Sequence, residues 1–185
     1  MQRLALVLLS LVFFIGCATL DHSLAKGWEY EKQGEYILAA HQYEGLLTTK
    51  PNEPKILYNT AIAYAKAAEY ESALTYLRQL NVITHNSNLY YLQALGGVAA
   101  AADKIDEAIA AWKLAIALDP LDKQSRAFLW DALQQLQRYE EAYEIALEAY
   151  KLKQYSKELL QLLGELHMRI EGKDSSDWAL LAQEL

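Results

Sequence analysis

Cysteine, proline and positive charge are scarce in this sequence. A single cysteine occurs among 185 residues, so no disulfide can form within the chain. Only three prolines interrupt the backbone, which leaves long stretches free to form helices. The 17 lysines and arginines are outnumbered by 24 aspartates and glutamates, giving a formal net charge of −7. An acidic chain argues against nucleic-acid partners and against membrane binding through basic residues.

The usual signatures of catalysis are also missing. The four histidines, His22, His41, His85 and His167, are scattered and lack metal-ligand spacing. The sequence contains neither a phosphate-binding glycine loop nor a Gly-x-Ser-x-Gly elbow. Its only thiol, Cys17, lies in the N-terminal segment. The sequence therefore predicts a protein that is not an enzyme and that holds no cofactor or metal.

What the sequence does contain is an alanine-rich repeating pattern. The stretch Asp106–Pro120 places Ala108, Trp112 and Ala115 at spacings of three and four, on one helical face, and Pro120 ends the helix. Similar patterns recur 34 or 35 residues away, with one extra residue in the Asn81–Asn88 connection. The matching positions are Tyr36, Ala39, Tyr43 and Pro51; Tyr70, Ala73, Leu77 and Leu80; Ile105, Ala108, Trp112 and Ala115; and Tyr139, Ala142, Ala146 and Ala149.

These four phased units resemble the tetratricopeptide-repeat (TPR) family over about Leu20–Arg169. The resemblance implies an all-α TPR α-solenoid, a right-handed superhelix of antiparallel helix pairs whose first helices line a concave face. We expect four repeats within residues 23–156, at about 20–53, 54–87, 89–122 and 123–156. Residues 157–185 are then a degenerate fifth repeat with capping helices, because a terminal repeat must cover an exposed apolar face.

Two positions on the first helices bear on how the helices pack. Gly96 falls at the small-residue position where the two helices of a repeat approach each other, and Gly97 falls on the concave face. Trp130 occupies the position that glycine or alanine usually holds, so we expect wider helix packing in the fourth unit.

Residues 1–16 form a predicted lipoprotein signal peptide. Arg3 gives a positive start, and the apolar run Leu4–Ile15 is too short to span a bilayer comfortably. The sequence Phe14-Ile15-Gly16-Cys17 resembles the bacterial lipobox, which implies acylation of Cys17 as the mature first residue. An ordinary signal peptide is the alternative. Residues 17–22 would be a short lipidated tether, and Ala18 in place of aspartate implies the outer membrane, facing the periplasm, by the enterobacterial sorting pattern.

The resemblance to TPR proteins also predicts which side chains line a partner-binding groove. Its first-helix side chains combine aromatic surface with amide groups, which suits an extended or helical peptide. The candidates are Trp28, Lys55, Tyr58, Asn59, Ile62, Tyr90, Gln93, Gln124 and Asp131, with Glu31 and Lys66 in the same register. An ordinary solvated helix face is the alternative. Tyr58 and Ile62 stand where a carboxylate clamp needs lysine and asparagine, so that clamp is not expected.

The sequence therefore predicts a membrane-anchored TPR lipoprotein that acts as a protein-interaction scaffold in the bacterial cell envelope. It would bind a peptide or helix of a protein partner in the groove and the membrane through N-terminal acyl chains. The alternative is an accessory ligand-binding or docking subunit of a periplasmic transport system. Self-association through the repeat ends is a third possibility.

Overall fold

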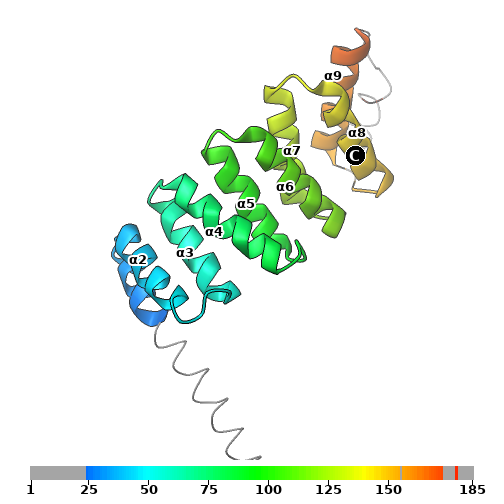
Figure 1. Ribbon diagram of the computed structural model, residues 1–185. Helices are drawn as coiled ribbons and strands as arrows, with labels where there is room; N and C mark the ends of the chain where they lie inside the picture. Colours follow the sequence, from blue (N-terminus) through cyan, green and yellow to red (C-terminus); the bar gives the residue numbers. More distant parts are fainter. Residues whose placement is uncertain (1–23, 155, 173–177, 179–185) are drawn as a thin grey trace, which may run out of the picture. The chain divides into compact units, whose positions relative to one another are not determined.

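The computed structural model describes residues 24–154, 156–172 and 178, and within these ranges the chain is helical with no strand. Within residues 24–83, and again within 89–171, short turns join consecutive helices, which run antiparallel (Figure 1). After a first helix at 24–32, the helices are α2 (Tyr36–Leu47), α3 (Pro54–Lys66), α4 (Tyr70–Ile83), α5 (Leu89–Ala101), α6 (Ile105–Leu118), α7 (Lys123–Gln135), α8 (Tyr139–Lys151) and α9 (Lys157–Glu171).

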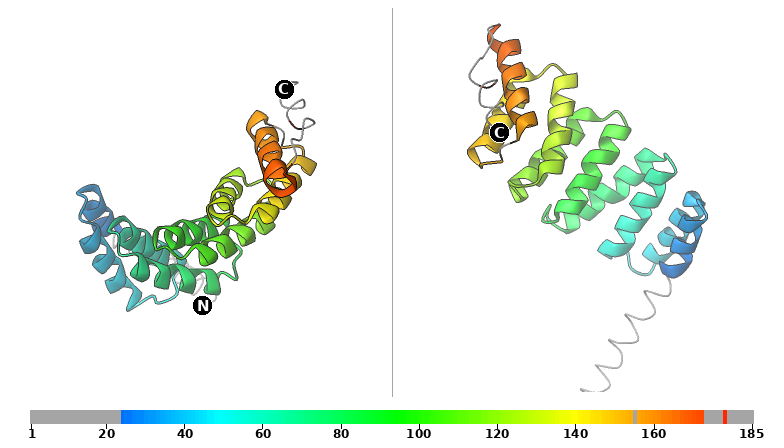
Figure 2. Two further views of the ribbon diagram at one scale, coloured as in Figure 1. Left: turned by 90° about the horizontal axis from the view of Figure 1, so that it is seen from above. Right: turned by 180° about the vertical axis from the view of Figure 1, so that it is seen from behind.

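The chain divides into two compact units, one ending at Asn86 and the other beginning at Ser87. In the first unit α3 packs against both α2 and α4. In the second unit each helix from α5 to α9 packs against the next, which Figure 2 shows from two directions. The division falls in the connection that carries the extra residue, where His85 and Asn86 both have a φ of 52°.

Polar side chains fix the starts of several helices. Asn88 Oδ1 accepts a hydrogen bond from the Tyr91 amide at 3.2 Å, and Ser156 Oγ accepts one from the Leu159 amide at 3.1 Å. Asp122 accepts from two amides of the first turn of α7. Each bond satisfies an amide that has no partner within its own helix. These caps explain why α5, α7 and α9 begin where they do.

The turn between the two helices of each pair has the same geometry four times. Gly34, Ala68, Asp103 and Gln137 have φ values of 78°, 61°, 60° and 58°, in the left-handed region. The amide that follows each of them donates to a carbonyl five residues back, at 2.8–3.0 Å. This bond closes the end of the first helix in the Schellman manner. Only the first of the four positions is glycine, the residue that adopts this conformation most easily.

Close approach of the paired helices depends on small residues. A Cβ atom added at Gly27 would overlap the Tyr43 ring, and one added at Gly96 would overlap the indole of Trp112. Nothing lies near a Cβ added at Gly97, which faces open space. The small residue on the first helix therefore makes room for a large residue on the second.

The fourth pair reverses this arrangement. In the repeat register Trp130 corresponds to Gly96, and Ala146 corresponds to Trp112, so the large residue is now on the first helix. Helix α7 packs against α8 less extensively than α5 packs against α6, as the sequence predicted for this unit. After Gly172, only Trp178 of the predicted fifth repeat and capping helices at 157–185 lies within the described residues. It is helical, and its ring meets Tyr150 edge-on at 5.3 Å.

Candidate functional site

One face of α3 carries most of the first unit's predicted groove residues. Lys55, Tyr58, Asn59 and Ile62 recur at spacings of three and four, so they share a side of the helix. The opposite side is buried, with Leu57 and five other residues of α3 in the core. The groove residues are exposed or half-buried. We call Trp28, Lys55, Tyr58, Asn59 and Ile62 the α3 face.

The structure brings Trp28 and Lys55 together from two different helices. The Lys55 ammonium lies 5.4 Å from the centroid of the Trp28 ring, a cation–π contact. Trp28 remains 39% exposed. The first helix at 24–32 and α3 therefore present one common surface, as the TPR register predicts for consecutive first helices.

A partly buried carboxylate, that of Glu31, holds this surface together. Glu31 accepts a hydrogen bond from the Tyr43 hydroxyl at 2.8 Å and forms an ion pair with Lys66 at 2.5 Å. Burial raises the pKa of Tyr43, and the hydrogen bond to Glu31 raises it further, so the hydroxyl stays a donor. Glu31 thereby links the first helix to α2 through Tyr43 and to α3 through Lys66.

Asn59 contributes a side-chain amide whose nitrogen lacks a hydrogen-bond acceptor among the described residues. Its Nδ2 is buried and has no hydrogen-bond partner among the described residues. An unpaired buried amide costs about 1–3 kcal/mol, so a ligand that supplies a carbonyl oxygen would recover part of that loss. An extended peptide backbone offers such carbonyls at regular intervals.

A tyrosine cluster in the same unit was not predicted from the sequence. The rings of Tyr64 and Tyr76 are stacked, with centroids 6.0 Å apart, and the Tyr76 hydroxyl donates to Glu44 at 2.6 Å. Burial and the Glu44 hydrogen bond raise the pKa of Tyr76 to about 12. The cluster joins α2, α3 and α4 and stabilises the unit. Its residues come from three helices, so only the repeat register could have indicated that they meet.

The second unit holds the other four predicted groove residues. Tyr90 is 71% exposed, and Gln124 and Asp131 are also exposed. Gln93 is partly used inside the fold, because its Nε2 donates to Asp122 Oδ2 at 2.9 Å. Burial raises the pKa of Asp122, but hydrogen bonds from Ser125 and Gln93 outweigh it and lower the pKa overall. Gln93 thus fastens α5 to the start of α7.

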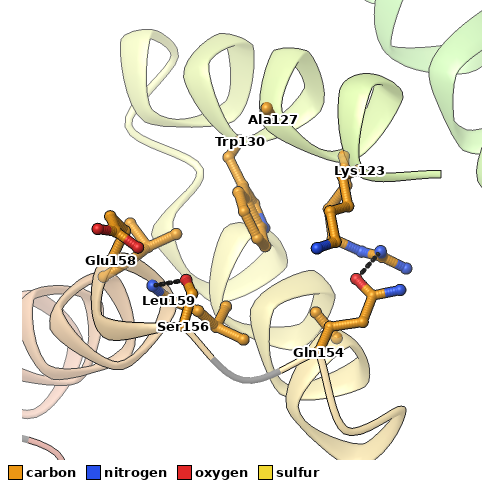
Figure 3. A pocket seen from close by; sticks show the side chains of 10 residues that line it. Lys123, Ala127, Trp130, Gln154, Ser156, Glu158 and Leu159 are labelled. Carbon is orange, nitrogen blue, oxygen red and sulfur yellow. Dashed lines mark hydrogen bonds between the residues drawn. The ribbon is translucent and has the colours of Figure 1, made fainter. Parts of the chain in front are cut away.

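The second unit also contains a cavity of about 300 Å³ between α7, α8 and the start of α9 (Figure 3). Its lining includes Lys123, Arg126, Trp130 and Leu159. Sequence reasoning missed Arg126, although a signal was present. The equivalent positions in the preceding and following repeats are Leu92 and Leu160, so a charged residue interrupts a core position.

The predicted signal peptide at 1–16, Cys17 and the predicted tether at 17–22 lie outside the described residues. Among the residues that are described, no helix is both long enough and apolar enough to cross a membrane. No group of three or more histidine, cysteine, aspartate or glutamate side chains in this part of the chain is placed to hold a metal.

This chain resembles known proteins in its structure, whereas comparisons of its sequence find no match. No family model and no curated protein matches the sequence. A crystal structure of MamA is 19% identical, with a TM-score of 0.69 and 88% of each chain covered. The first TPR of Spaghetti (RPAP3), bound to an HSP90 peptide, is 24% identical, with a TM-score of 0.56 over 62% of this chain and 90% of that one.

A third neighbour is Naa15/Naa10 bound to HypK-THB, at 16% identity and a TM-score of 0.63, covering 82% of this chain and 23% of that one. The chain has the TPR fold. The predicted all-α TPR solenoid is confirmed. The repeat boundaries and the groove residues remain predictions.

Proposed function

We propose that this TPR chain is a bacterial lipoprotein that serves as a protein-interaction scaffold in the cell envelope. Acyl chains on Cys17 would anchor it, and the α3 face would hold a peptide or helix of a protein partner. The proposal combines the lipobox-like sequence before Cys17 with the TPR fold. Two acyl chains hold a protein to a bilayer much more firmly than one.

The observation that carries the partner-binding part is the chemistry of the α3 face. The exposed Trp28 indole, in cation–π contact with Lys55, lies on the same surface as Asn59. The buried amide nitrogen of Asn59 lacks a hydrogen-bond partner among the described residues. Aromatic surface supplies burial, and the amide fixes the register of a bound backbone. Two structural neighbours, RPAP3 and Naa15, were solved with a peptide or protein bound, which supports this use of the fold.

Photocrosslinking in living cells tests the proposed face. A photoreactive phenylalanine replaces Tyr58, and the matched control places it at Thr75, an exposed position on α4. We expect one dominant protein adduct from position 58 that position 75 does not give. Equal yields of the same adducts from both positions would show that the α3 face is an ordinary solvated surface.

Substitution measures the strength of the same contact. Tyr58→Ala is expected to weaken capture of the crosslinked partner by at least about thirtyfold, the size of an interface hot spot. Thr75→Ala, the control, leaves capture unchanged. Circular dichroism of both variants verifies that the helices are retained.

Metabolic labelling with an alkyne-tagged palmitate tests the anchor. Cys17 is the only cysteine in the chain, so a labelled wild-type protein and an unlabelled Cys17→Ser variant are expected. Label that persists in Cys17→Ser would place the acyl group elsewhere and contradict the proposal. Recovery of the wild-type protein in the outer-membrane fraction of a density gradient tests the proposed location, and recovery in the inner-membrane fraction would contradict it.

A further inference from the structure

Arg126 is buried at a position that leucine occupies in three other repeats. Leu57, Leu92 and Leu160 occupy this position in other repeats and are buried, as Arg126 is at 1% exposure. Arg126 Nη2 donates to the Pro120 carbonyl and Nη1 to Gln154 Oε1, both at 2.8 Å, and Nε has no hydrogen-bond partner among the described residues. Both acceptors are neutral. Burying a guanidinium without a directly bonded carboxylate costs folding free energy. Packing alone therefore does not explain why arginine occupies this position.

The surrounding charges do not remove this cost. Glu148, Asp122 and Asp119 act on the guanidinium only through space, and burial lowers the pKa of Arg126 despite them. Glu148 borders a second hollow of about 330 Å³ on another side of Arg126. The cavity between α7, α8 and α9 therefore has a positive wall.

Lys123 and Trp130 extend that wall. Lys123 precedes Arg126 by one helical turn and also lines the cavity. Figure 3 shows the Trp130 indole between Lys123 and Glu158, with its nitrogen on the side of Lys123. That Nε1 is buried and has no hydrogen-bond partner within the described ranges. Two cations and two unpaired N–H groups thus gather at one end of the cavity.

The rest of the lining is mostly apolar, with Gln154 and Ser156 as polar members beside the α8–α9 connection and Glu158 at the far end. Ala127, Ala149, Leu159 and Leu162 line it together with the Trp130 ring, and Glu158 lies across the cavity from Lys123 (Figure 3). The carboxylate of Glu158 would repel a second negative charge. The volume of about 300 Å³ is at the lower end for small-molecule sites. The shape and charge fit one negative group on a small apolar body.

We propose that this cavity binds a small carboxylic acid with an apolar body. The carboxylate would lie against Lys123 and Arg126, where a small side-chain shift lets the Arg126 Nε and the Trp130 indole donate to it. The apolar body would lie against the alanine and leucine side chains. This ligand site is separate from the α3 face and does not depend on the proposed protein partner.

Calorimetry on the full chain in detergent tests the proposal with three probes of one shape. The probes are 3-phenylpropionate, its neutral amide and 3-phenylpropylammonium. We expect the acid to bind at least about tenfold more tightly than either of the others. Equal binding of the acid and the amide, or no binding of the acid, would overturn the proposal.

Three variants locate the binding. Arg126→Leu installs the leucine that three other repeats have at this position and is expected to weaken acid binding about tenfold or more. Lys123→Gln weakens it several-fold, and Lys50→Gln, an exposed lysine of the other unit, leaves it unchanged. Partition of the acid into detergent is the same for all of them. Equal affinity in Arg126→Leu and the wild type would overturn the site.

The NMR signals of the indole N–H groups test the site in the wild-type protein, so they remain informative if Arg126→Leu fails to fold. The chain has four tryptophans, so Trp130→Phe assigns the Trp130 indole N–H signal. The acid is expected to shift that signal in the wild-type protein and to shift it less in Lys123→Gln. An unmoved Trp130 signal at saturating acid would rule out this cavity.

Discussion

The α5–α6 pair and the α7–α8 pair are built from equivalent positions but divide their volume in opposite ways. On α5, Gly96 makes room for Trp112 of α6. On α7, Trp130 is the large residue, and Ala146 is its small counterpart on α8. The α5–α6 pair packs closely, whereas a cavity lies beside the α7–α8 pair. Two equivalent positions can thus hold one large and one small residue in either order, and the helix that carries the large residue decides which space is filled.

The largest expected effect separates the two tryptophans. Trp112→Ala is expected to lower the free energy of unfolding by about 4 kcal/mol, because the ring is 4% exposed and closely packed. Trp130→Ala costs about 2 kcal/mol, since its ring already borders empty space. Urea unfolding followed by circular dichroism measures both. A larger loss at Trp130 would show that the fourth pair is the tighter one.

Two neighbouring glycines sharpen the same comparison. Gly96→Ala is expected to cost about 2 kcal/mol, because its Cβ overlaps the Trp112 indole. Gly97→Ala, the control, gains up to about 1 kcal/mol from the better helix propensity of alanine. In a Trp112→Ala background the Gly96→Ala penalty disappears. Equal effects of the two glycine substitutions in the wild-type background would contradict the packing described.

Arg126 offers a test of intermediate size. Arg126→Leu is expected to change the free energy of unfolding by less than about 1 kcal/mol, because removal of a buried charge offsets the lost hydrogen bonds. Arg126→Ala is expected to cost about 2 kcal/mol, since it leaves a void as well. Thermal unfolding of both variants provides the measurement. A leucine variant that loses as much stability relative to the wild type as the alanine variant does would mean that the guanidinium itself holds the fourth pair together.

The smallest expected effect concerns an ion-pair group that joins α6 to α8. Glu141 contacts Lys113 at 2.8 Å and Arg138 at 2.6 Å, and its hydrogen bonds to Arg138 and Lys113 lower its pKa to about 2. A carboxylate whose pKa is lowered by folding stabilises the folded state at pH values above its ordinary pKa. That stabilisation is lost as the pH falls toward the pKa of the folded state. Because these side chains are partly exposed, Glu141→Gln costs only about 0.5 kcal/mol at neutral pH.

Urea unfolding at neutral pH and near pH 2 checks this prediction. The difference between wild type and Glu141→Gln is expected to shrink to about zero at the acidic end, where the carboxylate becomes protonated. A difference that is the same at both pH values would show that shape, and not charge, gives Glu141 its effect.

Periodicity made the fold predictable from the sequence. The recurrence of Ala39, Ala73, Ala108 and Ala142 established the helix pairs, and the substitution of Trp130 indicated the wider fourth pair. The partners of single side chains were not predictable. Gln93 bonds Asp122, a residue on a different helix start, and this depends on the rotamers of both side chains. The cavity beside Arg126 likewise depends on how three helices meet, which a repeat pattern does not specify.

The turns within the helix pairs have a consequence for cooperativity. Ala68, Asp103 and Gln137 adopt a left-handed conformation that costs a residue other than glycine about 1 kcal/mol. An isolated helix pair would carry that cost without the burial that flanking helices provide. We therefore expect the helices of each compact unit to melt together, so that deleting one terminal pair destabilises those that remain. Glycine at these three turns would loosen that dependence and make shortened arrays easier to fold.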